Sequence, residues 1–321
     1  MLMSSEVKPI YLYQLFGLAV RSEIEFPEFT SMSGEESKGV EYPWADLMHG
    51  KVPEQLEDSL PLADWIQVTK TDCLFSVAEK CRLLVSNGNR VTLDLFEGVP
   101  YEDIRPYMTT CGFATLAFQR QYVPLHVSAV ESPKGVWLFT GPSGAGKSTL
   151  SVALSKATGG PLLGDDLAVM EFPDPNSSLK GAICHFGVNK VKLWEDAAQS
   201  LGIERDKLER DFFRPHKYHV MIPPGRGTIK SEEIVGIMSL AWGDDMQDIS
   251  LTPMSGSGTF STLMNGIYPP FMAPAYLDLT RLRVILLGMS RGLKGVAATR
   301  PKRDGSLGEA ITAISTYIEQ S

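Results

Sequence analysis

The segment FTGPSGAGKSTLS, residues 139–151, contains the pattern G-x-x-x-x-G-K-S from Gly141 to Ser148. Gly141, Gly144 and Gly146 permit backbone conformations closed to other residues, so successive N–H groups can turn inward around an anion. An apolar run precedes this segment and a helical run follows it, and the positive end of the helix dipole would add to the attraction for phosphate. The pattern therefore predicts a phosphate-binding loop between a strand and a helix.

Each part of such a loop has a chemical role. Lys147 would reach the β- and γ-phosphates of a nucleotide, and the Ser148 hydroxyl would ligate magnesium. We therefore predict ATP and Mg²⁺ as ligands. The predicted nucleotide-binding residues are Gly141, Pro142, Ser143, Gly144, Ala145, Gly146, Lys147, Ser148 and Thr149.

An acid pair, Asp165 and Asp166, follows the short apolar run of residues 161–163. A right-handed crossover would place this run beside residues 136–139 and parallel to them, with the acids at the edge where ligands bind. Adjacent residues on an extended segment point to opposite sides, so one carboxylate could hold magnesium while the other accepts a proton from a hydroxyl. An ATPase needs only to orient water, so the second acid favours a kinase. A surface turn or a helix cap is the alternative.

The organisation of the chain predicts an α/β protein. Residues 1–100 contain short alternating runs typical of a small β-rich domain, and residues 29–60 are expected to form an irregular loop. Apolar residues at helical spacing predict a connecting helix over 101–122. Strands and helices alternate over 123–321, which predicts an α/β domain with a mixed sheet that carries the phosphate-binding loop.

Within that last part, further elements are predicted from their patterns. Residues 234–242 and 281–290 are expected to be strands, and residues 305–320 a closing helix. Residues 252–266 are expected to be a connector ahead of a short helix. The segment HKYH, residues 216–219, is expected to be solvated.

Composition limits the class of protein. The chain has 321 residues, 43% of them hydrophobic, and a net charge of −8, which argues against general nucleic-acid or anionic-membrane binding. Neither a membrane-spanning stretch nor a secretion signal is apparent. The four cysteines match no zinc or redox spacing, so we expect reduced thiols in a cytoplasmic protein.

Three segments together resemble the HPr kinase/phosphorylase family: PLHVSAV at 124–130, GPSGAGKST at 141–149 and GDDLAV at 164–169. Their order and spacing carry the resemblance. It implies a P-loop kinase core of the HPr kinase C-terminal type and a magnesium-dependent serine kinase.

The resemblance also implies roles for single residues. Asp165 would be the general base for the acceptor serine, and Asp166 the acid on the magnesium side. His126 would lie near the reacting phosphate or support the acids.

A narrower resemblance is to the HPr-kinase-like tailoring kinases of lasso-peptide gene clusters. Residues 13–29, YQLFGLAVRSEIEFPEF, are similar to the start of those proteins. This resemblance implies a serine in the C-terminal region of a lasso precursor peptide as the acceptor. The expected partner is thus a peptide or small protein that carries a serine, and a homo-oligomer is left open.

The chain also departs from the HPr-directed enzymes. Those enzymes carry a long basic, glycine-rich signature after the active site, and only PPGRG at 223–227 resembles it. The reverse, phosphorolytic reaction is therefore not assigned. An HPr-type protein kinase, a small-molecule kinase and a non-catalytic nucleotide-binding regulatory module stay as alternatives.

Phosphoryl transfer also calls for cations near the γ-phosphate, and an Arg could pair with the carboxylate of a peptide acceptor. Of the basic residues after the acid pair, we select Arg226 and Lys217 as substrate-binding candidates. The others are expected to lie on solvated faces: Lys190, Lys192, Arg214, Lys230, Arg281, Arg283, Arg291, Lys294, Arg300, Lys302 and Arg303.

Overall fold

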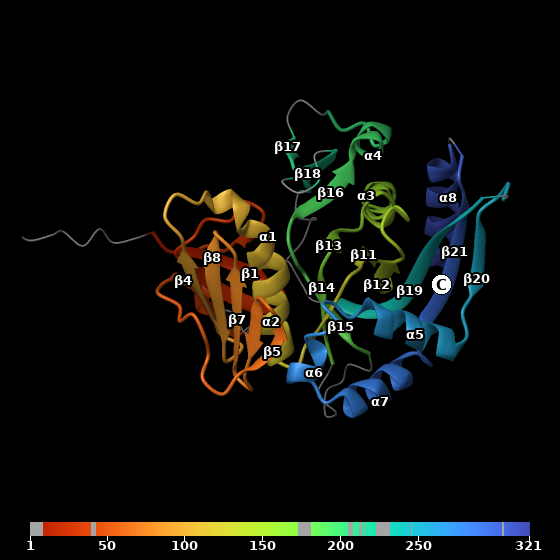
Figure 1. Ribbon diagram of the computed structural model, residues 1–321. Coiled ribbons are helices and arrows are strands. Elements are labelled where there is room, and N and C mark those ends of the chain that lie inside the picture. Colours follow the sequence, from red (N-terminus) through yellow and green to blue (C-terminus); the bar gives the residue numbers. More distant parts are fainter. Residues whose placement is uncertain are drawn as a thin grey trace, which may run out of the picture. The chain divides into compact units, whose positions relative to one another are not determined.

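The structure is a computed structural model, shown in Figure 1. It describes residues 9–39, 43–172, 181–204, 208–211, 214, 216–222, 232–244, 246–303 and 305–321. The chain divides into two compact units, Met1–Arg120 and Gln121–Ser321. Helices and mixed sheets together make the fold α/β.

The first unit contains a nine-stranded sheet in the order β3-β1-β2-β4-β9-β8-β7-β6-β5. Side chains that alternate between the core and the surface explain most of these strands, because a strand places successive side chains on opposite faces. The bounds are β1 Tyr11–Leu15, β2 Leu18–Ser22, β3 Thr30–Ser31, β4 Trp44–His49, β5 Leu60–Ala63, β6 Ile66–Val68, β7 Asp72–Val77, β8 Cys81–Ser86 and β9 Arg90–Leu95.

A run of helical turns follows this sheet in the sequence and belongs to the same unit. Phe113 from this run contacts Phe16 and Phe29 of the strand region, with ring centroids 5.8 and 5.4 Å apart. These aromatic contacts fix the helical run to its sheet. The bounds are η2 Tyr101–Asp103, α1 Arg105–Tyr107, the π-helical turn η3 Met108–Phe113 and α2 Ala114–Gln119.

Residues 29–60 contain more regular structure than the sequence predicted. The 3-10 turn η1 spans Glu36–Gly39, and β4 pairs in parallel with both β2 and β9. Ala45 and Leu47 of β4 are buried at alternate positions. The expectation of an irregular loop was wrong here because Gly, Pro and acidic residues on both sides obscured a short alternating run.

The second unit contains a mixed nine-stranded sheet in the order β10-β14-β15-β19-β12-β11-β13, with β21 pairing to β19 and to β20. Strands β12, β19 and β21 are parallel neighbours. The bounds are β10 Val123–Leu125, β11 Ser128–Ser132, β12 Gly135–Thr140, β13 Leu162–Gly164, β14 Ala168–Glu171, β15 Ile183–His185, β19 Glu232–Gly243, β20 Ser250–Pro253 and β21 Lys294–Pro301.

One detail of strand order differs from the prediction. The strand before the acid pair, β13, does not lie beside β12, because β11 lies between them and pairs antiparallel with both. Two antiparallel steps leave β13 parallel to β12, so the carboxyl ends of both strands still reach the same edge. The predicted direction of β13 is confirmed, and its predicted neighbour was wrong.

Among the described residues, helices α3 (Lys147–Thr158), α5 (Gly256–Gly266) and α8 (Ser306–Gln320) pack on this sheet, and α7 (Leu279–Met289) packs against α5. Helix α3 packs on β11 and against α8, and α5 packs on β19 and β21. Buried side chains under α3 and α8 include Trp137, Phe139, Leu150, Leu154 and Ile314. A short helix, α6, spans Ala273–Tyr276.

The closing helix agrees with the sequence. Two other expectations were wrong: most of the connector expected over 252–266 is helix α5, Gly256–Gly266, and the strand expected over 281–290 lies in helix α7. Asp278 caps α7 by accepting bonds from the N–H groups of Thr280 and Arg281. Leu282 and Leu286 are buried four residues apart, which is helical spacing. A run of β-branched and leucine residues does not distinguish a strand from a half-buried helix.

A small third sheet has the order β16-β18-β17, with bounds β16 Lys190–Trp194, β17 Glu209–Arg210 and β18 Lys217–Met221, and α4 (Glu195–Ser200) follows β16. Lys217 and Tyr218 are only 8% and 2% exposed. The expectation that HKYH is a solvated segment was therefore wrong over β18, because these residues form a strand paired with β16 and the Lys217 amine lies 5.2 Å from the centre of the Trp194 ring.

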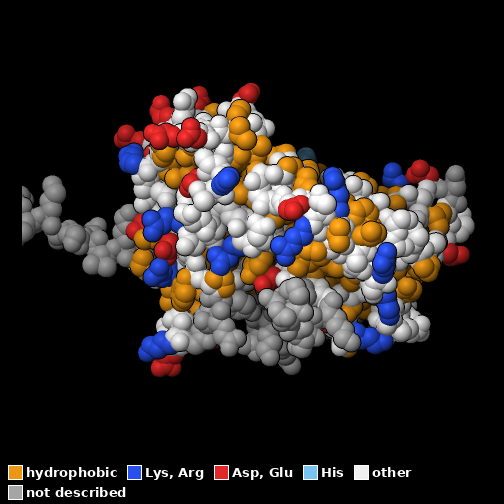
Figure 2. All heavy atoms as spheres, turned by 90° about the horizontal axis from the view of Figure 1, so that it is seen from below, with side chains coloured by type: hydrophobic (Ala, Val, Ile, Leu, Met, Phe, Trp, Pro, Cys, Tyr) orange, Lys and Arg blue, Asp and Glu red, His pale blue; other side chains and the backbone are white. Residues whose placement is uncertain are grey.

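Figure 2 shows Lys and Arg side chains scattered over the face that it draws. Within the described residues, every helix is too short or too polar to span a bilayer. The four cysteines, Cys73, Cys81, Cys111 and Cys184, are free thiols.

Candidate functional site

The loop of residues 141–146, here called the glycine loop, joins β12 to α3. Gly141, Gly144 and Gly146 have φ of 147°, 84° and 84°, a region that favours glycine. A Cβ on Gly141 would lie 2.5 Å from the carbonyl oxygen of Leu240 on β19. The loop thus requires glycine at this position for its close approach to the neighbouring strand.

Two side chains hold the back of the glycine loop. Trp242 Nε1 donates to the Gly144 carbonyl at 2.9 Å, and Arg300 Nη2 donates to the Ala145 carbonyl at 2.9 Å. A trans peptide holds its N–H opposite its C=O, so the Gly146 N–H points away from Arg300. These contacts fix the peptide planes with that donor turned to the other face of the loop.

Lys147 begins α3 and folds back over the loop. Its Nζ donates to the Gly141 carbonyl at 2.9 Å, and the residue is 8% exposed. Burial lowers the pKa of the Lys147 amine, while the charges of Asp166 and Asp165 act to raise it. The amine therefore lies within electrostatic reach of both acids.

Asp165 follows β13 and is buried. Its Oδ1 accepts a hydrogen bond from the Ser128 hydroxyl of β11 at 2.5 Å, and its Oδ2 has no partner among the described residues. Burial and the charge of Asp166 raise the pKa of Asp165 to about 6, and the hydroxyls of Ser128 and Ser148 and the Lys192 backbone act against this rise. The side chain is thus a buried carboxylate beside the start of α3, with one oxygen left to bind a ligand.

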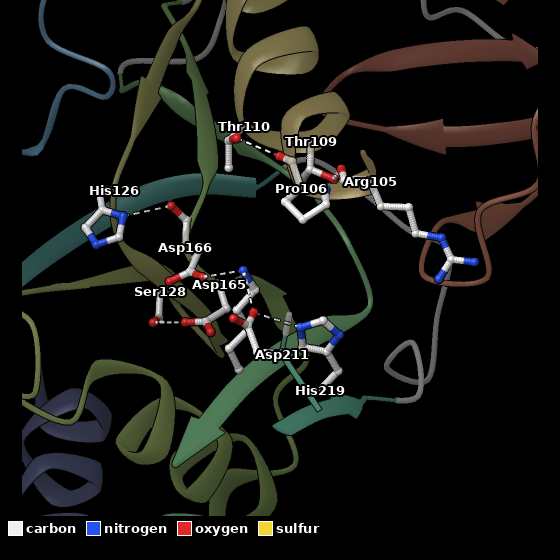
Figure 3. A network of polar contacts seen from close by, with 11 residues as sticks. Arg105, Pro106, Thr109, Thr110, His126, Ser128, Asp165, Asp166, Asp211 and His219 are labelled. Carbon is white, nitrogen blue, oxygen red and sulfur yellow. Dashed lines mark hydrogen bonds and ion pairs between the residues drawn. The ribbon is translucent and has the colours of Figure 1, made fainter. Parts of the chain in front are cut away.

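Asp166 has a different environment from its neighbour. Its φ is 61°, and its side chain is 37% exposed. Asp tolerates this left-handed conformation better than most residues. His126 Nδ1 lies 3.0 Å from the Asp166 carbonyl oxygen, and its ring lies 5.3 Å from that of Tyr268. Figure 3 shows the carboxylate of Asp166 turned away from His126, whose Nδ1 meets the backbone carbonyl of Asp166 instead.

A lysine from the small sheet completes this cluster. Lys192 Nζ lies 3.3 Å from Asp211 Oδ2 and 4.0 Å from Asp166 Oδ2. Asp211, which is 5% exposed, also lies 3.0 Å from His219 Nε2, as Figure 3 shows. Burial acts to raise the pKa of Asp211, but the contacts with His219 and Lys192 lower it overall. An ionised Asp211 therefore fixes Lys192 beside the acid pair.

Lys217 lies near the same acids. Its amine is 5.2 Å from the centre of the Trp194 ring. Burial lowers the pKa of Lys217, the charges of Asp166 and Asp165 act to raise it, and Arg214 and Lys192 act to lower it. Two lysines thus contribute positive charge next to two carboxylates.

The structure brings together most of the residues that the sequence singled out. Lys147, Ser148, Asp165, Asp166 and His126 meet at one edge of the sheet, with Lys217 close by. The remaining substrate candidate, Arg226, lies outside the described residues.

Sequence reasoning missed several of the residues that build this site, among them Trp242, Ser128, Lys192, Arg300 and Asp211. Ser128 lies within the PLHVSAV segment, which was the available signal, but its role depends on the pairing of β11 with β13. Lys192 and Arg300 were expected on solvated faces, yet Arg300 is 3% exposed. Asp211 comes from a two-stranded addition to β16 that no local pattern indicated.

No family model and no curated protein matches the sequence. Among solved structures, the chain is similar to the Hpr(Ser) kinase/phosphatase from Coxiella burnetii, with 14% identity and a TM-score of 0.27. That similarity covers 61% of this chain and 88% of the other. A likeness at this level carries no argument about family or function.

Proposed function

We propose that residues 121–321 form a magnesium-dependent kinase that transfers the γ-phosphoryl group of ATP to a hydroxyl. The observation that carries this proposal is the meeting of the glycine loop with a buried acid. The Ser148 hydroxyl, at the start of α3, acts to lower the pKa of the Asp165 carboxyl, and the Oδ2 of that carboxyl has no partner among the described residues.

The glycine loop fits the phosphates of a nucleotide. Glycines with positive φ, together with the Gly144 and Ala145 carbonyls that accept bonds from Trp242 and Arg300, support a concave run of N–H groups. Helix α3 directs the positive end of its dipole toward the phosphates bound there. The Lys147 amine is bound by the Gly141 carbonyl in this structure. It would exchange this contact for phosphate oxygens.

The donor set also fits magnesium. Hydroxyl and carboxylate oxygens suit this hard cation, and the orphaned Oδ2 of Asp165 is a buried acceptor. The described residues contain no group of three or more His, Cys, Asp or Glu that could hold a metal ion. Magnesium bound chiefly by phosphates would take Ser148 and Asp165 as its protein ligands. When bound, the ion would neutralise charge on the phosphates.

The roles of the two acids follow from burial. Asp165 is the carboxylate beside Ser148, so we assign it to the magnesium side. Asp166 is more exposed and would accept the proton from the incoming hydroxyl. The sequence suggested the opposite roles, and the contrast in burial favours the reversed assignment. His126 supports the backbone of Asp166 rather than the reacting phosphate.

Lys192 and Lys217 would neutralise charge that develops on the transferred group. Lys192 is held by Asp211, so its position is set before substrate binds. This arrangement favours transfer over simple nucleotide binding, because a regulatory module needs no fixed cations beyond the γ-phosphate.

For the acceptor, we propose a serine of a peptide or small protein. The lasso precursor peptide is the specific candidate, and it rests on the resemblance of the sequence. The same phosphoryl transfer could use a serine of an HPr-type protein or the hydroxyl of a small alcohol as the acceptor.

The test is phosphoryl transfer by the full chain with ATP and magnesium. The acceptor panel contains a lasso precursor peptide, HPr, unrelated serine peptides and small alcohols, and mass spectrometry detects the added phosphoryl group. Asp166→Asn should abolish transfer and leave Mg·ADP affinity within about threefold. Asp248→Asn, at an exposed site, is the matched control and should change neither. A chain that binds Mg·ADP but modifies no acceptor would support the regulatory module, and one that binds no nucleotide would overturn the proposal.

A further inference from the structure

The strand order gives the bound nucleotide a direction. The glycine loop follows β12, which lies between β11 and β19. The acid pair follows β13, beyond β11, whereas β19 and β21 lie on the opposite side, as Figure 1 shows. If the terminal phosphate faces the acids, the nucleoside end must leave the glycine loop toward the ends of β19 and β21.

Trp242 lies at that place. It comes from the carboxyl end of β19 and is 39% exposed, although it is among the largest apolar side chains. Its Nε1 is bonded to the Gly144 carbonyl of the glycine loop. The ring is therefore fixed to the loop while much of its surface faces solvent.

Arg300, from the end of β21, covers one part of the same ring. Its guanidinium carbon lies 4.3 Å from the centre of the Trp242 ring, within the range of a cation–π contact. Arg300 is 3% exposed, forms no ion pair with the described residues, and leaves its Nε without a hydrogen-bond partner. Burial of an unpaired charge is unfavourable, so a nearby anion would stabilise it.

These contacts hold an aromatic ring rigidly beside a predicted phosphate site, with open surface on the side where the nucleoside must lie. We propose that Trp242 is the stacking platform for the base of the bound nucleotide, with Arg300 fixing the ring from behind. Stacking reads no hydrogen-bond pattern, so purines of either kind should bind, and more tightly than pyrimidines because their rings overlap more. This inference rests on the proposed nucleotide site.

The test compares Mg·ADP with Mg·pyrophosphate, which lacks the base, in calorimetric titrations of the full chain. Trp242→Leu should weaken Mg·ADP about 10- to 100-fold more than it weakens Mg·pyrophosphate, the range expected for one stacked base, because loss of the bond to Gly144 affects both ligands alike. Trp242→Phe also loses the bond to Gly144 but keeps a ring, so it should recover most of the ADP affinity. Bound ADP should quench tryptophan fluorescence in the wild type but not in either variant.

A matched control is Trp65→Leu, which removes a tryptophan of similar exposure, 38%, from the first unit. It should alter neither affinity. Equal loss of ADP and pyrophosphate in Trp242→Leu would show that the ring only shapes the loop, and would overturn the platform. Equal affinity of the wild type for ADP and pyrophosphate would also overturn the platform, but it would not contradict the proposed phosphate site. Failure of the wild type to bind either ligand would overturn both proposals.

Discussion

Ser128 and Asp165 are joined by a hydrogen bond of 2.5 Å, which ties β11 to the residue that follows β13. The bond occupies Oδ1 and leaves Oδ2 as the oxygen available to a ligand. Because the carboxyl is buried, its protonation state responds to whatever charge binds beside it. The protonation state of Asp165 should therefore affect both ligand binding and stability.

The first prediction concerns ligand affinity and pH. The pKa of Asp165 is about 6, so the carboxyl is protonated below that pH and must lose a proton to bind a cation. Calorimetry should show Mg·ADP affinity falling by up to about tenfold per pH unit below 6. ADP without magnesium should not weaken, because protonation removes a negative charge near the phosphates. Asp165→Asn should bind Mg·ADP weakly and lose less affinity below pH 6 than the wild type, because only the phosphates of the nucleotide still titrate there. An unchanged pH slope in this variant would contradict the assignment.

The second prediction concerns stability. A carboxyl whose pKa is raised in the folded chain binds more protons there than in the unfolded chain between about pH 4 and 6. Its contribution to stability is therefore present below pH 4 and lost as the pH rises through 6. Without ligands, Asp165→Asn should exceed the wild type in unfolding free energy at pH 8 by about 1–3 kcal/mol. Urea titrations should show this difference disappearing near pH 4, and a constant difference at all pH values would argue against a strained carboxylate.

The sequence predicted the parts of this site that are local. A helix at 147–158 and a short strand before Asp165 follow from glycines and apolar runs, and both are present. The direction of β13 was also predictable, since a strand that follows a helical crossover in the same sheet is expected to run parallel to the strand before it.

The parts of the site that the sequence did not predict depend on pairing between segments that are distant in the sequence. Nothing near Ser128 or Asp165 in the sequence indicates that β11 lies between β12 and β13. Likewise, Arg300 is buried because β21 pairs with β19 along its whole length. A basic residue among other basic residues gives no sign of such burial, so composition alone placed it on the surface.

The third prediction concerns the lysine held by Asp211. If Asp211 only positions Lys192, then Asp211→Asn should lower the rate of phosphoryl transfer about 10- to 100-fold while Mg·ADP affinity stays within threefold. Lys192→Met should have a similar effect, and Lys192→Arg should restore part of the rate. In a double-mutant cycle, the combined variant should be no worse than either single one. Additive losses would mean that the two residues act separately.

The fourth prediction compares two lysines of one helix. Lys147 lies over the glycine loop, whereas Lys156 is exposed near the other end of α3 and donates to the Leu201 carbonyl. Lys147→Met should weaken Mg·ADP about 10- to 100-fold, the range for loss of a charge-assisted hydrogen bond. Lys156→Met should leave affinity unchanged. If calorimetry shows that both changes alter the Mg·ADP affinity equally, Lys147 does not bind the phosphates.

The fifth prediction separates backbone strain from side-chain contact in the glycine loop. Gly144 and Gly146 share a φ of 84°, so alanine at either position meets the same left-handed strain. A Cβ on Gly144 would meet nothing within 4 Å, whereas one on Gly146 would lie 2.4 Å from Arg300 Nη2. We expect Gly144→Ala to lower the unfolding free energy by about 1–2 kcal/mol.

Gly146→Ala should lower the unfolding free energy by a further ~1–3 kcal/mol, because Arg300 is buried and cannot move freely out of the way. Urea unfolding of both variants measures the difference. In an Arg300→Met background the clash with the guanidinium is absent, so the two alanine variants should become similar in stability. If Gly146→Ala stays the less stable of the two in that background, another contact accounts for its cost, and Arg300 does not hold the loop in the way that its bond to Ala145 indicates.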